Sequence, residues 1–146
     1  MNIEIGGGSL VGPGWINMDP THFGTEGWRR NAQDGPWPAG DGSVTAIRAS
    51  HVMEHIPAGV DRLFVMNEAH RVLAPGGTFE IIVPLMTGSW HAVADPTHVS
   101  FWCLESFHYF DGLFAANADY GIRPWTTKEL HVLDDPNIGR WVGTPR

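Results

Sequence analysis

The feature that most constrains the fold is a strand, a helix and a second strand in succession in the middle of the chain. Val44 to Ala49 is an apolar strand introduced by the turn Asp41-Gly42-Ser43. Apolar side chains then recur at helical spacing from Val60 to Leu73, and Pro75-Gly76-Gly77 ends this helix. Thr78 to Val83 is the second strand. Two strands joined by one helix predict an α/β fold with a mainly parallel sheet.

The rest of the chain has to share that core. The 146 residues, 42% hydrophobic and 17% charged, suit one globular domain, and we see no repeat or long linker. We therefore expect a single domain over residues 1–146. Trp28 to Asn31 is a candidate short strand, Leu104 to Phe110 is helix-like, and two final strands are expected at Tyr120 to Trp125 and Trp141 to Gly143.

A glycine-rich loop lies between two short strands at the N-terminus. Ile3 to Ile5 is a short buried strand that runs directly into Gly6-Gly7-Gly8. Trp15 to Met18 alternates apolar and polar residues, and Asp19 stands at its tip. In an open α/β sheet, ligands bind beyond the carboxyl ends of the strands, where an acidic residue is placed to hold a ribose. This arrangement predicts a nucleotide-like ligand.

The segments that carry these features resemble a known family when they are taken together. IEIGGGS, GWINMD, DGSVTAIRASHVMEHI and NEAHRVLAPGGTFEIIVP are similar to the small class I S-adenosylmethionine-dependent methyltransferases, over roughly Ile3 to Pro84. The resemblance implies a Rossmann-like fold and S-adenosylmethionine as the cofactor. The residues it implies are Glu4, Gly6, Gly7 and Gly8 around the methionine part, Asp19 at the ribose, Asp34 and Gly35 at the adenine amino group, and Ser50 and His51 facing cofactor and acceptor.

The chain departs from this family where the first helix is expected. Only Gly6 to Gly14 separate the first two strands, whereas a parallel crossover usually needs a dozen or more residues. The first helix must therefore be absent or reduced to a turn, and the family's helices before the first strand are also missing. Parallel sheets are normally covered on both faces, so we expect a second subunit to cover this one, as a homo-oligomer.

The residues from Trp90 to Trp102 follow the second central strand, where a loop meets the methyl acceptor. They are similar to a D-P-T-H-V segment in some methyltransferases of this group. Transfer to a hydroxyl needs a base, and His98 or His51 can take the proton, with Asp95 orienting the imidazole. The alternative is that Asp95 caps a turn at Pro96 and His98 packs against Phe101 or Trp102.

A rival interpretation comes from the sequence between His51 and His55, which satisfies the H-x-x-E-H pattern of inverted zinc peptidases. In that pattern both histidines ligate the metal and Glu54 acts as the base. Pro57 ends the segment within about one helical turn, whereas the motif needs a sustained helix. We therefore expect no metal, and His55 is equally consistent with a buried histidine bonded to backbone.

The charge and the cysteine content limit the partners and the compartment. The formal net charge of −7, with Lys128 as the only lysine, disfavours nucleic acid. Cys103 is the only cysteine, which excludes an internal disulfide and favours a reducing compartment. The longest apolar run, Phe79 to Met86, is far below the roughly 20 residues of a membrane span. We expect a cytoplasmic protein without a membrane segment.

The function inferred from the sequence is methyl transfer from S-adenosylmethionine to an oxygen or nitrogen of a small-molecule or glycan-like acceptor. The alternative is a catalytically degenerate methyltransferase fold that acts as a binding or assembly module. The short glycine loop and the missing helices favour the alternative. Asp19 and Asp34 oppose it.

Overall fold

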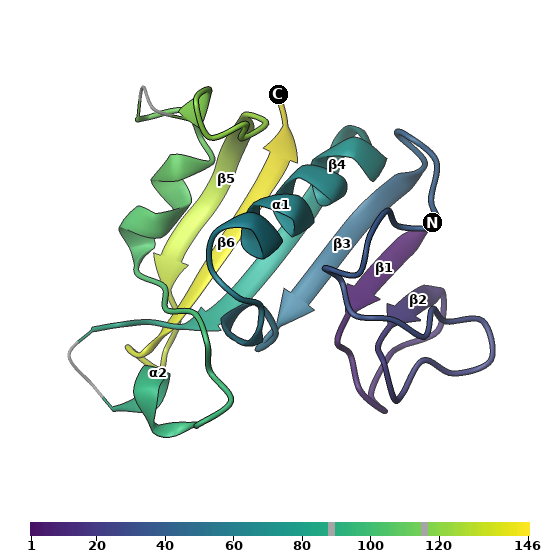
Figure 1. Ribbon diagram of the computed structural model, residues 1–146, viewed down its shortest axis with the longest axis horizontal. Helices are drawn as coiled ribbons and strands as arrows, with labels where there is room; N and C mark the ends of the chain where they lie inside the picture. The colour runs from purple at the N-terminus through teal and green to yellow at the C-terminus, as the bar shows by residue number, and fades with distance from the viewer. Residues whose placement is uncertain (88–89, 115–116) are drawn as a thin grey trace.

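The computed structural model describes residues 1–87, 90–114 and 117–146. They form one six-stranded sheet in the order β2-β1-β3-β4-β6-β5 (Figure 1). The pairings between β1 and β2, β1 and β3, and β3 and β4 are parallel, and β6 pairs antiparallel with both β4 and β5. The predicted α/β fold with a mainly parallel sheet is confirmed.

The elements follow the expected order in the first half of the chain and depart from it in the second. They are β1 (Asn2–Ile5), β2 (Trp15–Met18), β3 (Val44–Ser50), the 3-10 helix η1 (Met53–His55), α1 (Val60–Val72), β4 (Leu73–Pro84), α2 (His91–Ala94), the 3-10 helix η2 (Leu104–Tyr109), β5 (Trp125–Val132) and β6 (Ile138–Pro145). None of the helices in the described residues is long and apolar enough to cross a membrane.

The helix ends at Val72 and β4 starts at Leu73, so Pro75-Gly76-Gly77 lie within this strand and do not end the helix as expected. Two further expected strands are also wrong in extent. Trp28 makes only an isolated parallel bridge with Met18, so the strand expected at 28–31 is one residue pair. The strand expected at 120–125 begins only at Trp125, because Gly121 turns the chain at φ 69° and Pro124 has no N–H to donate. The helix-like segment after residue 103 is the 3-10 helix η2.

The hydrophobic core lies between α1 and one face of the sheet. Alternate residues of the strands point to this face and are fully buried, among them Ile3, Ile47, Phe79 and Trp141. Trp141 stacks on Phe107 at a centroid distance of 5.5 Å, which joins η2 to the same core. The buried apolar side chains of the described residues form one cluster.

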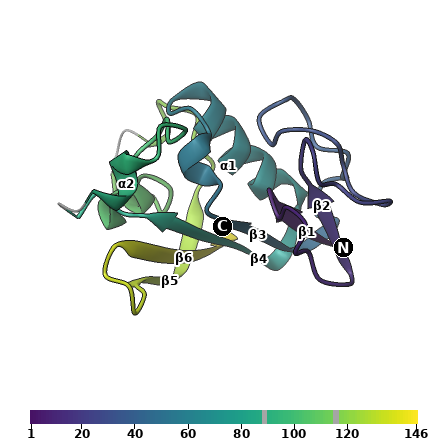
Figure 2. The ribbon, with the colours of Figure 1, turned by 90° about the horizontal axis from the view of Figure 1, so that it is seen from below.

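The opposite face of the sheet carries charged side chains instead of a helical layer. Figure 2 shows α1 on one side of the sheet and no described helix on the other. Five charged side chains cross this open face, one from each of five strands: Glu4, Arg48, Glu80, Arg140 and Glu129. Because an ion-paired face is compatible with water, it does not require an apolar cover. The homo-oligomer therefore stays a prediction, because this face does not need a second subunit to cover it.

The connection between β1 and β2 contains no helix, as its length predicts. Residues 6–14 are turns and irregular backbone throughout. Gly6 N donates to Met18 O at 2.8 Å, which keeps the start of the loop against the end of β2. The glycine loop therefore lies at the carboxyl edge of the sheet without a helix N-terminus behind it.

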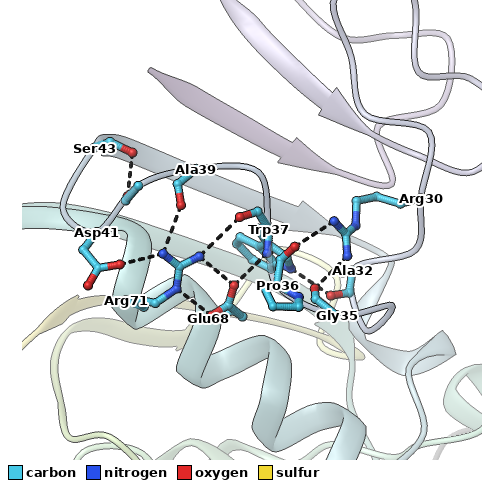
Figure 3. Close-up of polar contacts among 11 residues, drawn as sticks. Arg30, Ala32, Gly35, Pro36, Trp37, Ala39, Asp41, Ser43, Glu68 and Arg71 are labelled. Carbon is cyan, nitrogen blue, oxygen red and sulfur yellow. Dashed lines mark hydrogen bonds and ion pairs between the residues drawn. The ribbon is translucent and has the colours of Figure 1, made fainter.

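The long loop before β3 is held on α1 by two charged side chains (Figure 3). The buried Glu68 carboxylate accepts a hydrogen bond of 2.7 Å from Trp37 N and binds the Arg71 guanidinium. Arg71 also binds Asp41, at 2.6 Å, and the carbonyl of Ala39, at 3.0 Å. These contacts, which we call the Glu68–Arg71 clamp, hold the loop at Trp37, Ala39 and Asp41.

We expect Glu68→Ala to lower the free energy of unfolding by about 1–3 kcal/mol at neutral pH, because it leaves buried donors of Trp37 and Arg71 without an acceptor. Urea unfolding measures the change, and Glu26→Ala, at an exposed glutamate, is the matched control. An equal effect of both substitutions contradicts the clamp.

The same clamp predicts a pH dependence. The hydrogen bonds from Arg71 hold the pKa of Glu68 below its ordinary value of 4.5, against an opposing effect of burial. Its stabilisation is therefore present above pH 4.5 and is lost as the pH falls through the lower, folded-state pKa. The difference in unfolding free energy between the wild type and Glu68→Ala is expected to narrow as the pH is lowered to about 3.

Candidate functional site

Two side chains of the β2 end hold the glycine loop at the carboxyl edge. Gly7 N donates to Asn17 Oδ1 at 3.1 Å, and Gly8 N donates to Asp19 Oδ2 at 3.2 Å. Asn17 Nδ2 returns a hydrogen bond of 2.9 Å to the Gly8 carbonyl. Gly6 has φ 61°, and a Cβ atom there would lie 2.6 Å from a methyl group of Val52. The loop thus approaches the segment after β3 closely, which glycine alone permits.

Asp19, the predicted ribose ligand, is almost fully buried and rich in hydrogen bonds. Its Oδ1 accepts from Thr21 N at 2.8 Å, from the Thr21 hydroxyl at 3.0 Å and from His22 N at 2.7 Å. Its Oδ2 accepts only from Gly8 N. Burial alone raises the pKa of Asp19, but these hydrogen bonds outweigh it and the pKa lies below its ordinary value. Oδ2 is the oxygen with the greater remaining capacity to accept.

A small cavity of about 100 Å³ lies beyond the carboxyl ends of β1, β2 and β3. Its lining residues are Ile5, Gly6, Met18, Pro20, Arg30, Asn31, Ala32, Gln33, Val52, His55 and Ile56. The lining combines apolar side chains with the polar side chains of Arg30, Asn31, Gln33 and His55. This composition suits a flat, polar-edged ring.

Asp34 and Gly35 do not line this cavity. Asp34 Oδ2 instead accepts hydrogen bonds from Asn31 N at 3.1 Å and Asn31 Nδ2 at 2.9 Å. Arg30 binds the carbonyls of Asp34 and Gly35 at 2.9 and 2.7 Å. These two residues therefore shape the turn that presents Asn31 and Gln33. Asn31 and Gln33 were not predicted from the sequence, where their only signal is two amide side chains next to Asp34.

A larger cavity of about 490 Å³ opens from the same glycine loop onto the charged face of the sheet. Its lining residues are Glu4, Gly6, Gly7, Leu10, Arg48, Ser50, Glu80 and Ile82. Glu4 binds Arg48 through Nε and a terminal nitrogen, both at 2.6 Å, and this contact raises the pKa of Arg48. Gly6 lines both cavities, so they meet at the glycine loop. Arg48 was also missed, although strand alternation places it on the face of Glu4.

Ser50 and His51 lie at the end of β3, next to a third cavity. This cavity of about 550 Å³ is lined by Ser50, His51, Ile82 and residues 131–135 and 138. His51 is half-exposed and has φ 55°, which is uncommon for a residue other than glycine. Its Nδ1 lies 3.5 Å from Glu54 Oε1, and this contact raises the pKa of His51 against the effect of burial.

His98 and Asp95 lie next to each other, and the His98 side chain is less exposed to solvent than that of His51. The His98 side chain is only 10% exposed, and its Nδ1 lies 2.9 Å from the carbonyl of Ala92. Asp95 Oδ1 accepts from the amide and the hydroxyl of Thr97, at 2.8 and 2.6 Å, so it caps the turn there. Asp95 Oδ2 lies 3.8 Å from His98 Nε2. The geometry places an acid beside an imidazole in a shielded position.

The helix that the zinc-peptidase pattern needs is not formed. Residues 53–55 are the three-residue 3-10 helix η1, which ends before Pro57. His55 Nδ1 lies 3.2 Å from the carbonyl of Thr97, so this imidazole faces backbone.

The segment from Trp90 to Trp102, expected to meet the methyl acceptor, begins and ends with tryptophans of different exposure. Trp90 is 68% exposed, and Trp102 is buried in the core.

Comparison with known proteins identifies the fold. A family model described as a methyltransferase domain matches residues 22–81. A protein from Pyrococcus horikoshii aligns with a TM-score of 0.72 and 11% identity over 99% of this chain and 81% of its own. A chain of the complex of the Haloferax volcanii Trm112 methyltransferase activator with a putative methyltransferase aligns with a TM-score of 0.69, 16% identity and the same coverages.

A third solved structure, an S-adenosylmethionine-dependent methyltransferase from Aquifex aeolicus, has a TM-score of 0.63 and 12% identity over 97% of this chain and 80% of its own. No curated protein matches the sequence. At these identities the structures show the fold, which is the Rossmann-like fold of the S-adenosylmethionine-dependent methyltransferases. The resemblance noted in the sequence is confirmed by the family model and by the fold.

The glycine loop yields a prediction with an internal control. Gly6 and Gly8 have nearly the same φ, 61° and 56°, but a Cβ at Gly8 would meet nothing within 4 Å. Gly8→Ala carries only the backbone strain of about 1–2 kcal/mol, and Gly6→Ala adds the contact with Val52. We expect Gly6→Ala to be the more destabilising in urea unfolding, and the difference to shrink in a Val52→Ala background. Equal effects of the two substitutions contradict this close approach.

Proposed function

We propose that the chain binds S-adenosylmethionine across the two cavities that meet at Gly6 and transfers its methyl group to an oxygen or nitrogen of a small-molecule or glycan-like acceptor. The observation that carries the proposal is the pairing of these cavities. One is small and lined by apolar side chains together with two amides, an arginine and a histidine, and the other presents Glu4 and Arg48. A ligand with a ring at one end and an amino acid at the other matches both.

The methionine end of the ligand carries an ammonium and a carboxylate. Glu4 and Arg48 present the complementary charges on one wall of the larger cavity, and they hold each other at 2.6 Å. Glu4 is only 4% exposed, so its orientation is fixed before the ligand arrives. Gly7 and Gly8 keep the adjoining backbone free of side chains. This assignment keeps Glu4 and the glycines in the role expected from the sequence and adds Arg48.

The adenosine end is assigned to the smaller cavity. Asp19 does not line this cavity, but its neighbours Met18 and Pro20 do. Its Oδ2 accepts a single hydrogen bond and is the acceptor we assign to the ribose hydroxyls. Asn31 and Gln33 border the cavity and are placed to read the edge of the adenine. Asp34 and Gly35 act indirectly: they hold the turn that presents Asn31 and Gln33, and we assign them no contact with the adenine.

His51 is the side chain that we assign to the acceptor proton. S-adenosylmethionine supplies a methyl group on a positively charged sulfur, and the acceptor takes this group with release of the thioether and a proton. His51 borders the cavity of about 550 Å³ at the end of β3, beside Ser50, and its ring is held by Glu54. The His98 side chain is only 10% exposed, so we do not assign His98 or Asp95 to the acceptor proton.

The alternative of a binding or assembly module draws on a specific observation. Asp19 already accepts four hydrogen bonds, about as many as a carboxylate has sites for. If this aspartate serves only to hold the glycine loop, the chain keeps the fold without binding the cofactor. Cofactor binding therefore separates the two functions.

The first test uses S-adenosylhomocysteine and 5′-methylthioadenosine, which lacks the amino-acid end, as calorimetric probes. We expect both to bind the wild type. Arg48→Ala is expected to weaken S-adenosylhomocysteine by roughly 10- to 100-fold, the value of a charge-assisted hydrogen bond, and to leave methylthioadenosine within a few-fold.

Asn31→Ala is the matched variant, since it is expected to weaken both probes to a similar extent. An Arg48→Ala variant that binds S-adenosylhomocysteine as the wild type does contradicts the assignment of the methionine end. Failure of the wild type to bind either probe at millimolar concentration favours the assembly module.

A second test concerns His51. Tritiated methyl transfer from S-adenosylmethionine to a panel of sugars, phenols and amines identifies an acceptor. With that acceptor, His51→Gln is expected to lower kcat by about 10²- to 10⁴-fold, the usual contribution of a general base. Its affinity for S-adenosylhomocysteine is expected to stay within a few-fold of wild type. Unchanged kcat overturns the assignment, and a parallel loss of affinity indicates a structural role.

A further inference from the structure

We propose that Glu54, His55 and His98 form a binding site for one divalent transition-metal ion. One ligand atom from each residue lies within 4.8 Å of the others. The two imidazole rings meet edge to face at a centroid distance of 4.9 Å. Glu54 and His55 come from η1 and His98 from the loop after α2, so the fold brings together residues more than 40 positions apart.

Both imidazoles face a backbone carbonyl through their Nδ1 atoms. His98 Nδ1 lies 2.9 Å from the carbonyl of Ala92, and His55 Nδ1 lies 3.2 Å from the carbonyl of Thr97. A carbonyl oxygen only accepts, so in the neutral ring each Nδ1 carries the hydrogen and each Nε2 keeps a lone pair. A histidine that binds a metal commonly donates its other nitrogen to backbone in this way.

The Nε2 atom of His98 faces two acidic oxygens. It lies 3.9 Å from Glu54 Oε1 and 3.8 Å from Asp95 Oδ2, too far for a hydrogen bond. A lone pair directed at carboxylates is unfavourable without a positive charge between them. Metal bonds of ~2.0–2.2 Å from nitrogen and oxygen span such separations. Asp95 adds a second carboxylate beside His98, outside the group of three ligand atoms.

The Glu54 carboxylate gives a second, independent indication. Glu54 is 1% exposed, and its Oε2 has no hydrogen-bond partner among the described residues. A buried carboxylate oxygen without a partner is costly, whereas a bound cation would compensate it. The backbone holds the cluster together, because the Glu54 carbonyl accepts from Val99 N at 2.9 Å and from Ser100 N at 3.0 Å.

Two imidazoles with carboxylates indicate the class of ion. This ligand set suits Zn²⁺ and its first-row neighbours rather than Mg²⁺ or Ca²⁺, which prefer oxygen ligands. The site differs from the H-x-x-E-H pattern, because His98 takes the place of His51 and no long helix is needed. His55 also lines the smaller cavity, so the ion would lie beside it. The site does not depend on the proposed methyl transfer.

The test is metal binding by a chain free of tag histidines, stripped with a chelator and titrated with Zn²⁺ by calorimetry and with Co²⁺ by visible absorption. We expect one ion per chain and the absorption bands of Co²⁺ bound by nitrogen and oxygen. His98→Ala and Glu54→Gln are expected to weaken Zn²⁺ by at least ~10-fold, since even supporting residues of a metal site contribute that much. His131→Ala, at an exposed histidine on β5, is the matched control.

No binding by the wild type at millimolar Zn²⁺ overturns the proposal, whatever the variants do. Equal binding by the wild type and by a folded His98→Ala variant also overturns it, because the ion is then held elsewhere. Circular dichroism of the metal-free variants establishes that they fold. The S-adenosylhomocysteine titration is a separate measurement, so the failure of one proposal does not resemble the failure of the other.

Discussion

Five side chains of alternating charge run across the sheet face that no described helix covers, from Glu4 on β1 through Arg48, Glu80 and Arg140 to Glu129 on β5. Each partly exposed ion pair contributes little to stability by itself, about 0–1 kcal/mol. Together they make this face compatible with water, which a largely parallel sheet seldom is. The main apolar core therefore lies on the side of α1.

The missing helix after β1 has a structural consequence at the same edge. In its absence, Asn17 and Asp19 hold the glycine loop through hydrogen bonds to Gly7 and Gly8. Asp19 thereby takes part in the architecture as well as in the candidate ribose site. A larger fold assigns these two tasks to different groups, since a helix N-terminus supplies its own amides. In this chain, the same carboxylate holds the glycine loop and forms the candidate ribose site.

The sequence was sufficient where local patterns decide the structure. Periodicity predicted β3, α1 and β4, and the length of the 6–14 loop predicted that no helix follows β1. It was insufficient where distant segments meet. The strand order puts Arg48 beside Glu4, and contacts from Arg30 hold the turn at Asp34, next to the cavity-lining Asn31. Strand alternation and the two amides near Asp34 were only weak signals, because they do not show which segments meet.

Glu54 is the point where the two proposed activities meet. Its Oε1 lies 3.5 Å from His51 Nδ1 and 3.9 Å from His98 Nε2, so the same oxygen faces the assigned base and the proposed metal site. A cation bound by this carboxylate would compete with His51 for it and change how firmly that ring is held. A substitution of Glu54 therefore disturbs both functions at once. His98 and His51, which each belong to only one of them, are the positions at which the two can be separated.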